Sequence, residues 1–238
     1  MFLVGLEELS EVGVGSCWIG WSPVFGQAKD FAVKMRNEAS RDSVGYVRHP
    51  GKLVLTDGPF KEGHPFLELG LHPEVLGVAE NYLGTPPLLF SVQLNWSFPF
   101  AEDITGTSYL WHRDSDDSRC LKVILYLNDV SGKQGPFSYV KGTHVTKKTP
   151  VQVLGRSSDF SILEMFGGRA QEITGKAGTL VFADVGGLHK AKPVEEGERL
   201  ALFLQYTTDR PRTAPRHVLL GDSCGGPASN FALGGLRA

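Results

Sequence analysis

Short apolar runs separated by turn residues dominate the second half of this 238-residue chain. From Leu88 onward, β-rich segments alternate with Gly, Pro, Asn and Asp turns, which is the pattern of a sandwich or a jelly roll. The run 178–184 (GTLVFAD) predicts a buried strand that breaks at a Gly-Gly pair. The run 200–206 (LALFLQY) predicts another strand, which Arg199 opens. We therefore predict a mainly β fold.

The first part of the chain is less regular. Residues 1–60 mix short apolar runs with Gly and Pro, and they predict an edge-strand pair and a helix near Gln27–Glu38. The amphipathic segment 71–83 predicts a second helix with Pro73 in its first turn, where the missing N–H of proline has no cost. We expect these helices to flank the β core.

The chain has no internal repeat and no composition shift that would mark a linker. We expect a single domain over 1–238, with a helical and edge-strand part at about 1–87, a jelly-roll core at about 88–208 and a C-terminal tail at 209–238. A hydrophobic content of 41% agrees with this, because barrels of this length commonly fold as one unit.

Charge and cysteine content narrow the class of protein. The net charge is −2 and the pI is about 6.4, so we expect no nucleic-acid partner and no anionic membrane partner. The three cysteines are odd in number and irregularly spaced, which argues against a disulfide framework and favours a reducing compartment. The first residues lack a signal-peptide pattern, and no apolar run approaches the roughly 20 residues of a membrane-spanning helix. We therefore expect a cytoplasmic protein.

Three residues form a candidate metal site. His112 and Asp114 lie in or beside a predicted strand, where side chains two residues apart point to the same face, so both could bind one metal while Arg113 points away. His189 follows the predicted strand at 178–184. Two histidines and one carboxylate make the facial triad that holds Fe(II) and leaves positions open for an oxidant and a co-substrate.

Arg199 lies ten residues after His189, at the start of a predicted strand. A fixed guanidinium in this place could pair through two hydrogen bonds with a carboxylate of a co-substrate. Simpler interpretations exist for each residue. His112 and Asp114 could be an exposed loop pair, His189 could be a surface histidine beside Lys190, and Arg199 could be a strand-edge charge. The combination and order of the four residues favour the metal and co-substrate hypothesis.

Four sequence elements occur in a characteristic order, namely 71–84 (LHPEVLGVAENYLG), 111–114 (WHRD), 124–144 (ILYLNDV followed by GPFSYVKGTH) and 189–206, which holds His189, Arg199, Gln205 and Tyr206. With these elements the chain resembles the phytanoyl-CoA dioxygenase (PhyH-like) family of Fe(II)/2-oxoglutarate-dependent oxygenases. The resemblance extends from about Leu71 to Tyr206, which is over half of the chain.

The resemblance implies a cupin-like double-stranded β-helix, or jelly roll, with flanking α-helices. It implies that His112, Asp114 and His189 bind Fe(II), that Arg199 binds the far carboxylate of the co-substrate 2-oxoglutarate, and that O2 is the oxidant. The expected reaction is hydroxylation of an unactivated C–H bond of a small molecule, for instance a secondary metabolite, with release of succinate and CO2. Related halogenases lack the carboxylate ligand, so Asp114 favours a hydroxylase or a desaturase.

The chain departs from the pattern near the co-substrate. The wider superfamily often has a serine two residues after the arginine, whereas this chain has Ala201. One hydrogen bond to 2-oxoglutarate must then come from another residue. Gln93 and Asn95, on one face of a predicted strand, and Lys122 are the candidates. A solvated strand face is the alternative for Gln93, and plain surface cover is the alternative for Lys122.

Other polar and aromatic residues have structural interpretations. We expect Trp111 to pack in the core and His144 to lie in a turn without binding metal. The insert 145–176 is expected to form a loop over the mouth of the site, because it has weak periodicity and lies between the two metal-binding elements. The basic stretch 210–217 could meet an anionic substrate, but a solvated arm is the simpler interpretation.

Two other classes of protein stay open. A cupin-type metalloenzyme that does not use 2-oxoglutarate would share the barrel and the metal, but it would not need Arg199. A non-catalytic jelly-roll binding protein would not need three metal ligands. The sequence leaves open the substrate, the regiochemistry and whether the protein is a monomer or a homodimer.

Overall fold

The structure is a computed structural model, and it describes residues 6–20, 22–39, 47–55, 60, 63–105, 107–114, 116–145 and 155–208. The helices within these ranges are α1 (Leu6–Val12), α2 (Pro23–Glu38), α3 (Pro65–Gly70), α4 (Pro73–Leu83), α6 (Asp159–Phe166) and the 3-10 helix η1 (Gly167–Arg169). The strands are β1 (Val14–Trp18), β2 (Val47–His49), β3 (Lys52–Leu55), β4 (Leu88–Ser97), β5 (Cys120–Tyr126), β6 (Phe137–Val140), β7 (Ala170–Ile173), β8 (Thr179–Asp184), β9 (His189–Ala191) and β10 (Arg199–Thr207).

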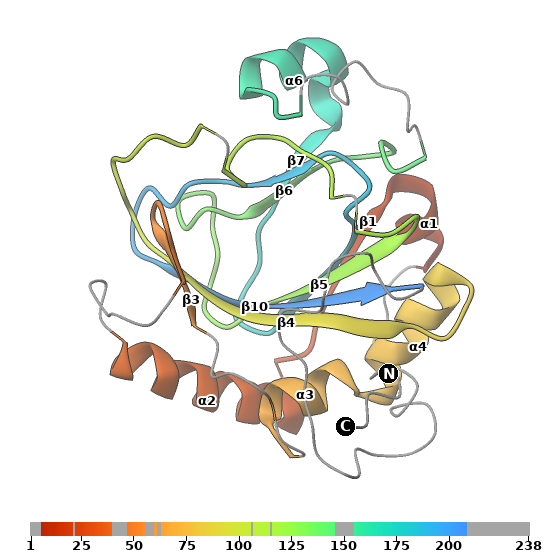
Figure 1. The fold of residues 1–238 in the computed structure, drawn as a ribbon, viewed down its shortest axis with the longest axis vertical. Helices are drawn as coiled ribbons and strands as arrows, with labels where there is room; N and C mark the ends of the chain where they lie inside the picture. The colour runs from red at the N-terminus through yellow and green to blue at the C-terminus, as the bar shows by residue number, and fades with distance from the viewer. Residues whose placement is uncertain are drawn as a thin grey trace.

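The strands form two antiparallel sheets that face each other (Figure 1). The large sheet has seven strands in the order β1-β8-β5-β10-β4-β3-β2, and the small sheet has three in the order β7-β6-β9. Helices α2, α3 and α4 lie on the outer face of the large sheet (Figure 1). The predicted mainly β fold with flanking helices is confirmed. Strands from the N-terminal part form both edges of the large sheet, β1 at one and β2 at the other.

Alternation along the central strands separates the core from the space between the sheets. On β10, Leu200, Leu202, Leu204 and Tyr206 belong to the hydrophobic cluster that packs against the helices. The intervening Arg199, Phe203 and Gln205 line a cavity on the opposite face. This division follows from the two-residue period of a strand. The long strands therefore supply the core and the cavity from the same segments of sequence.

The predicted helices exist with shifted ends. The helix predicted near Gln27–Glu38 begins earlier, at Pro23, because proline is well suited to the first turn. Helix α4 ends at Leu83, as predicted, but it begins at Pro73, two residues after the predicted start; Gly84 closes it in the left-handed conformation (φ 76°). Among the residues described, no helix is both long and apolar enough to cross a membrane.

The prediction of a loop over 145–176 is wrong for the described part of that insert. Residues 159–166 form α6, which Ser158 caps by accepting a hydrogen bond from the Ser161 N–H, and residues 170–173 form β7 of the small sheet. Residues 170–173 form a strand because they pair with β6, and the periodicity of the sequence does not reveal such pairing. Residues 146–154, the basic stretch 210–217 and the tail lie outside the described residues.

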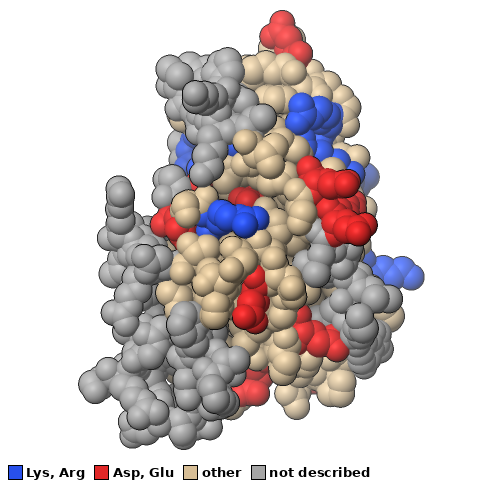
Figure 2. All heavy atoms as spheres, turned by 90° about the vertical axis from the view of Figure 1, so that its right-hand side faces the viewer, with Lys and Arg blue, Asp and Glu red and all other residues tan. Residues whose placement is uncertain are grey.

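Acidic and basic side chains are interspersed on the face drawn in Figure 2. The exposed apolar side chains are few among the described residues, and three of them, Phe160, Leu163 and Met165, lie on α6. Helix α6 projects beyond the small sheet in Figure 1. The functional candidates lie elsewhere, in the space between the two sheets.

Candidate functional site

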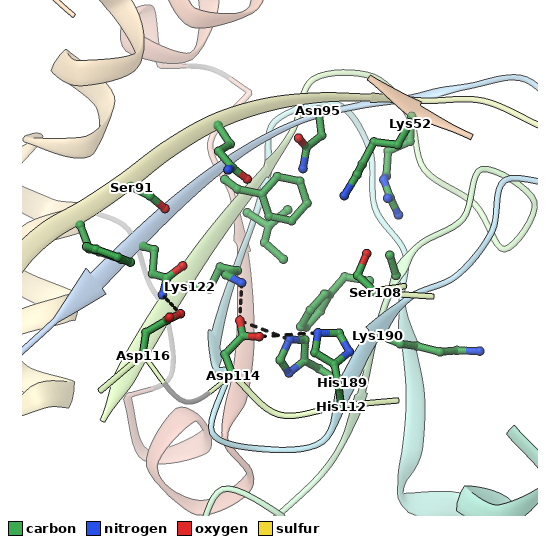
Figure 3. A pocket seen from close by; sticks show the side chains of 18 of the residues that line it. Lys52, Ser91, Asn95, Ser108, His112, Asp114, Asp116, Lys122, His189 and Lys190 are labelled. Atoms are coloured by element: carbon green, nitrogen blue, oxygen red, sulfur yellow. Dashed lines mark hydrogen bonds and ion pairs between the residues drawn. The ribbon is translucent and has the colours of Figure 1, made fainter. Parts of the chain in front are cut away.

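The side chains of His112, Asp114 and His189 converge between the sheets (Figure 3). The Nε2 atom of His112 lies 3.6 Å from Oδ1 of Asp114, and Nε2 of His189 lies 3.7 Å from Oδ2. One potential ligand atom from each residue lies within 4.8 Å of the other two. Two imidazole nitrogens and one carboxylate are the donor set of a mononuclear Fe(II) site, so these residues fit such an ion.

Backbone contacts fix both imidazoles in the form that binds metal. The two histidines form an isolated antiparallel bridge, in which each backbone N–H donates to the carbonyl of the other at 3.0 Å. Nδ1 of His112 lies 2.8 Å from the Leu110 carbonyl, and Nδ1 of His189 lies 3.0 Å from the Gly187 carbonyl. A carbonyl can only accept, so each Nδ1 carries the proton, and each Nε2 lone pair is free to face the site.

Burial and charge favour the same ionisation states. Burial lowers the pKa of His189 to about 3 and also lowers the pKa of His112, so both rings are neutral at ordinary pH. Burial alone would raise the pKa of Asp114, but Lys122 and the two histidines outweigh it and hold that pKa well below its usual range. The site thus presents two neutral imidazoles and a carboxylate, which is the state that binds a divalent cation.

Residues beside the two histidines are joined by one carboxylate from α6. Oδ1 of Asp159 accepts hydrogen bonds from Nε1 of Trp111 (2.6 Å) and from Nζ of Lys190 (2.5 Å). Trp111 precedes His112 and Lys190 follows His189. Asp159 therefore ties together the two segments that carry the imidazoles. This role of Asp159 could not be predicted from the sequence, because it depends on where α6 docks.

Arg113 and His144 lie as expected from the sequence. The Arg113 guanidinium leaves the site and donates to the carbonyls of Thr143 (2.7 Å) and Gly186. His144 lies in a turn, with Nε2 3.1 Å from the Ser10 carbonyl, and it is not part of the candidate metal cluster. Trp111 is buried, as a core residue should be.

Lys122 contacts the carboxylate of the candidate triad. Its Nζ lies 2.6 Å from Oδ2 of Asp114, and burial of its side chain is compensated by that ion pair, which raises the Lys122 pKa. The geometry leaves Oδ1 of Asp114 for a metal. Lys122 lines the cavity, as its predicted role near the co-substrate requires, but its contact is with Asp114 of the candidate triad.

The cavity between the sheets has a volume of about 310 Å³, and Arg199 closes one end of it. Arg199 is 2% exposed and lies opposite Ser97 on β4, to whose Oγ it donates a hydrogen bond at 3.3 Å. Its buried Nε has no hydrogen-bond partner in the described part of the chain, and neither has Oδ1 of Asn95 nearby. A buried guanidinium nitrogen without a protein partner is suited to an anionic ligand, because buried charged groups are usually paired. A dicarboxylate such as 2-oxoglutarate fits this end.

Lys52 is a second cation at this end, and the sequence analysis missed it. It pairs in register with Ser97 from the other side, so Lys52 and Arg199 flank that serine across three neighbouring strands. Burial, and then the charges of Arg199 and Lys122, lower the pKa of Lys52 to about 8. No carboxylate of the described ranges forms an ion pair with it. In sequence Lys52 only precedes an apolar run, so no local signal distinguishes it from a charge at a strand end.

Gln93 and Asn95 line the same cavity from β4, on the face predicted for them. Asp116 and Gln205 also line it, and Nε2 of Gln205 donates to Oδ2 of Asp116 at 2.8 Å. Neither was predicted as a site residue, although the alternation of β10 places Gln205, a buried polar residue, on the same strand face as Arg199.

Comparison with known proteins supports the assignment that the motifs suggested. The sequence pattern of the phytanoyl-CoA dioxygenase family matches residues 26–199. A comparison with curated proteins gives no significant match. Three solved structures illustrate the similarity of fold, with sequence identities too low to transfer a substrate.

EctD from S. alaskensis, in its apoform, has a TM-score of 0.64 at 18% identity, covering 94% of this chain and 87% of that one. The epimerase SnoN, in complex with Fe3+, alpha ketoglutarate and nogalamycin RO, has a TM-score of 0.62 at 18% identity, covering 91% and 94%. HygX from Streptomyces hygroscopicus, with nickel, 2-oxoglutarate and hygromycin B bound, has a TM-score of 0.59 at 15% identity, covering 91% and 95%.

Proposed function

The chain belongs to the phytanoyl-CoA dioxygenase family, and from that premise we propose that it is a Fe(II)/2-oxoglutarate-dependent oxygenase that hydroxylates a C–H bond of a small molecule. In this proposal His112, Asp114 and His189 bind the iron, and Arg199 binds the far carboxylate of 2-oxoglutarate. The observation that carries it is the convergence of the three ligands on a cavity that ends at a buried, incompletely paired arginine.

Iron, 2-oxoglutarate and O2 together would supply the oxidising chemistry, with succinate and CO2 as by-products. The protein would position these groups. The protonated Nδ1 atoms of His112 and His189 keep their Nε2 lone pairs directed inward. Lys122 holds one oxygen of Asp114 and leaves the other for the metal.

Arg199 and Lys52 would bind the far carboxylate together. Arg199 supplies a guanidinium whose Nε has no partner among the described residues, and Lys52 supplies an ammonium group on the other side of Ser97. Asn95, with its unpaired Oδ1, and Gln93 lie next along β4. This arrangement makes Lys52 a candidate for the hydrogen bond that Ala201 cannot provide. Ile124, Phe137 and Phe203 form apolar walls that would exclude water from the reacting C–H bond.

Hydroxylation is the reaction we favour among those of related enzymes. Solved structures of similar fold include an epimerase and a carbocyclase, so the fold accommodates several outcomes. The carboxylate ligand Asp114 argues against halogenation, which needs that position free for a halide. Mass spectrometry of the product should find a substrate heavier by one oxygen atom, and a product of unchanged mass would indicate epimerisation instead.

The test of the function is anaerobic titration of the Fe(II)-loaded protein with 2-oxoglutarate. We expect the weak visible charge-transfer band of a chelated 2-oxo acid in wild type, no band in His112→Ala, and a band that needs much more co-substrate in Arg199→Ala. Iron binding without a band would favour a cupin-type metalloenzyme. Absence of stoichiometric iron would favour a non-catalytic binding protein.

A further inference from the structure

We propose that Ser91, Asp116 and Gln205 form a substrate subsite that accepts hydroxyl groups of an uncharged polyol, such as a sugar or a cyclitol. This inference rests on the proposed function and adds the substrate class to it.

The subsite lies at the end of the cavity away from the co-substrate. Gln205 pairs in register with Ser91 on β4 and with Lys122 on β5, whereas Arg199 pairs with Ser97. Gln205 lies six positions after Arg199 on β10, which corresponds to about 20 Å along the sheet. In Figure 3, Ser91 and Asp116 lie on one side of Lys122, and Lys52 and Asn95 lie on the other.

Lys122 marks the position of the metal site between these two ends, because it contacts Asp114. A five-carbon diacid that is held by Arg199 and directed toward Asp114 would occupy the Lys52 end. The Gln205 end would then be left for the molecule that is oxidised. A ligand there would lie next to the metal without competing with 2-oxoglutarate.

The atoms that remain free at this end are hydrogen-bond acceptors. The Nε2 amide of Gln205 donates to Oδ2 of Asp116 (2.8 Å) and lies 3.1 Å from the sulfur of Cys120. Its hydrogens are therefore used within the protein, and Oε1 is left as an acceptor for a ligand. Gln205 contacts Oδ2 of Asp116, so this contact leaves Oδ1 available as an acceptor, and the Ser91 hydroxyl can accept or donate. A matching ligand must bring several donors.

Charge distinguishes hydroxyl donors from ammonium donors. Of the charged side chains that line the cavity, Lys190 is paired with Asp159; the others are Lys52, Lys122, Arg199, Asp114 and Asp116. Cations outnumber carboxylates by one in that second group, and divalent iron would cancel the two charges of 2-oxoglutarate. The loaded cavity would thus be net positive, and the charge of Lys122, which acts on Asp116, offsets the attraction of that carboxylate for an ammonium group. A carboxylate would meet the acceptors of Asp116 and Gln205, so an uncharged donor fits best.

Size and apolar surface agree with a compact ring. A volume of about 310 Å³ is at the lower limit of ligand pockets, which suits a co-substrate and one ring-sized molecule but not a long acyl thioester. Phe90 and Phe203 line the cavity and offer flat apolar surface to the C–H face of a ring. Hydroxyls at the ring edge would then reach Asp116 and Gln205.

The test is ligand-observed NMR with full-length protein loaded with Zn(II) and 2-oxoglutarate, in which no turnover occurs. The probes are neutral monosaccharides and cyclitols including myo-inositol, together with amino and carboxylate counterparts on the same rings. We expect at least one neutral polyol to bind at least about tenfold more tightly than its charged counterparts. Asp116→Asn should weaken that polyol about tenfold, as expected for a hydrogen bond to a charged group, and leave 2-oxoglutarate affinity within about twofold.

Ser91→Ala is a second, milder variant that should weaken the polyol a few-fold. Glu172→Gln, which removes a carboxylate from the small sheet outside this cavity, should change neither affinity. The subsite proposal is overturned if 2-oxoglutarate binds but no neutral polyol does, if the amine or the acid binds best, or if Asp116→Asn binds the polyol as wild type does. Failure of 2-oxoglutarate itself to bind would refute the proposed function, and the subsite with it.

Discussion

Arg199 and His189 are each the first residue of a strand, but the two strands hold them in different ways. Arg199 begins the nine-residue β10, which pairs with β4 on one side and β5 on the other. His189 begins the three-residue β9 at the edge of the small sheet, where β6 is its strand neighbour. The arginine is therefore placed by a long backbone ladder. The histidine has few ladder bonds to place it.

Side chains supply what the short strand lacks. Asp159 joins Trp111 and Lys190, and the turn before His189 is held by Asp184, which accepts hydrogen bonds from the Tyr82 hydroxyl (2.6 Å) and the Gly186 N–H (2.8 Å). Metal geometry should thus be sensitive to substitutions outside the ligand set. Binding of the co-substrate should depend mainly on Arg199 and Lys52 themselves.

The largest effect should follow from removal of a ligand on the small sheet. We expect His189→Ala to weaken Fe(II) or Co(II) binding because one of three donors is lost. The loss should exceed the roughly 10- to 100-fold that is typical when a hydrogen-bond partner of a ligand is replaced. Isothermal titration with Co(II) measures this. His144→Ala is the matched control, since that histidine pairs with Ser10, and it should retain wild-type affinity. Equal losses in the two variants would contradict the ligand assignment.

The next largest effect should follow from substitution of Arg199 on the large sheet, and this substitution should leave the metal bound. Arg199→Leu is expected to weaken 2-oxoglutarate by about 2 kcal/mol or more, roughly 30-fold, while Co(II) affinity stays near wild type. Arg199→Lys should recover part of this loss, because lysine keeps the charge without the two-pronged geometry. Lys133→Met, at an exposed ion pair, is the control. A parallel loss of metal in Arg199→Leu would show that the two sheets do not act separately.

A smaller effect should distinguish Asp159, which contacts Trp111 and Lys190, from the candidate ligands themselves. Asp159→Asn keeps the shape of the side chain but removes its charge, so we expect Co(II) affinity to fall about tenfold through looser placement of both histidines. Hydrogen exchange should also increase in 155–166. Glu172→Gln removes another carboxylate near the small sheet, one that pairs with Lys192, and should leave metal affinity unchanged. Unchanged Co(II) affinity in Asp159→Asn would mean that the charge of Asp159 is not needed to place the two histidines.

The smallest effect should appear as a pH dependence. The pKa of Lys52 is lowered to about 8 by burial and by neighbouring cations, so Lys52 is charged below that pH and loses its charge above it. Affinity for 2-oxoglutarate should therefore decline as the pH rises through about 8 in wild type. Lys52→Met should bind roughly tenfold more weakly at pH 7, because a charge-assisted hydrogen bond is lost, and should lack the decline. If the decline in 2-oxoglutarate affinity with pH persists in Lys52→Met, a group other than Lys52 causes it.

The sequence by itself predicted the residues of the candidate centre and determined the class of fold. His112 and Asp114 share a face because they are two residues apart, and Arg199 faces the cavity because a strand alternates. These relations are local and can be read along the chain. The helix that begins at Pro73 and the buried strand β8 follow from equally local signals.

The tertiary structure decided which distant residues join that centre. Lys52 lies near Arg199 because β3 pairs with β4. Asp116 is held at the cavity by its hydrogen bond with Gln205. Asp159 contacts both histidine segments because α6 docks there. Strand order and docking depend on the packing of the whole core. A sequence window of ten or twenty residues contains no record of them.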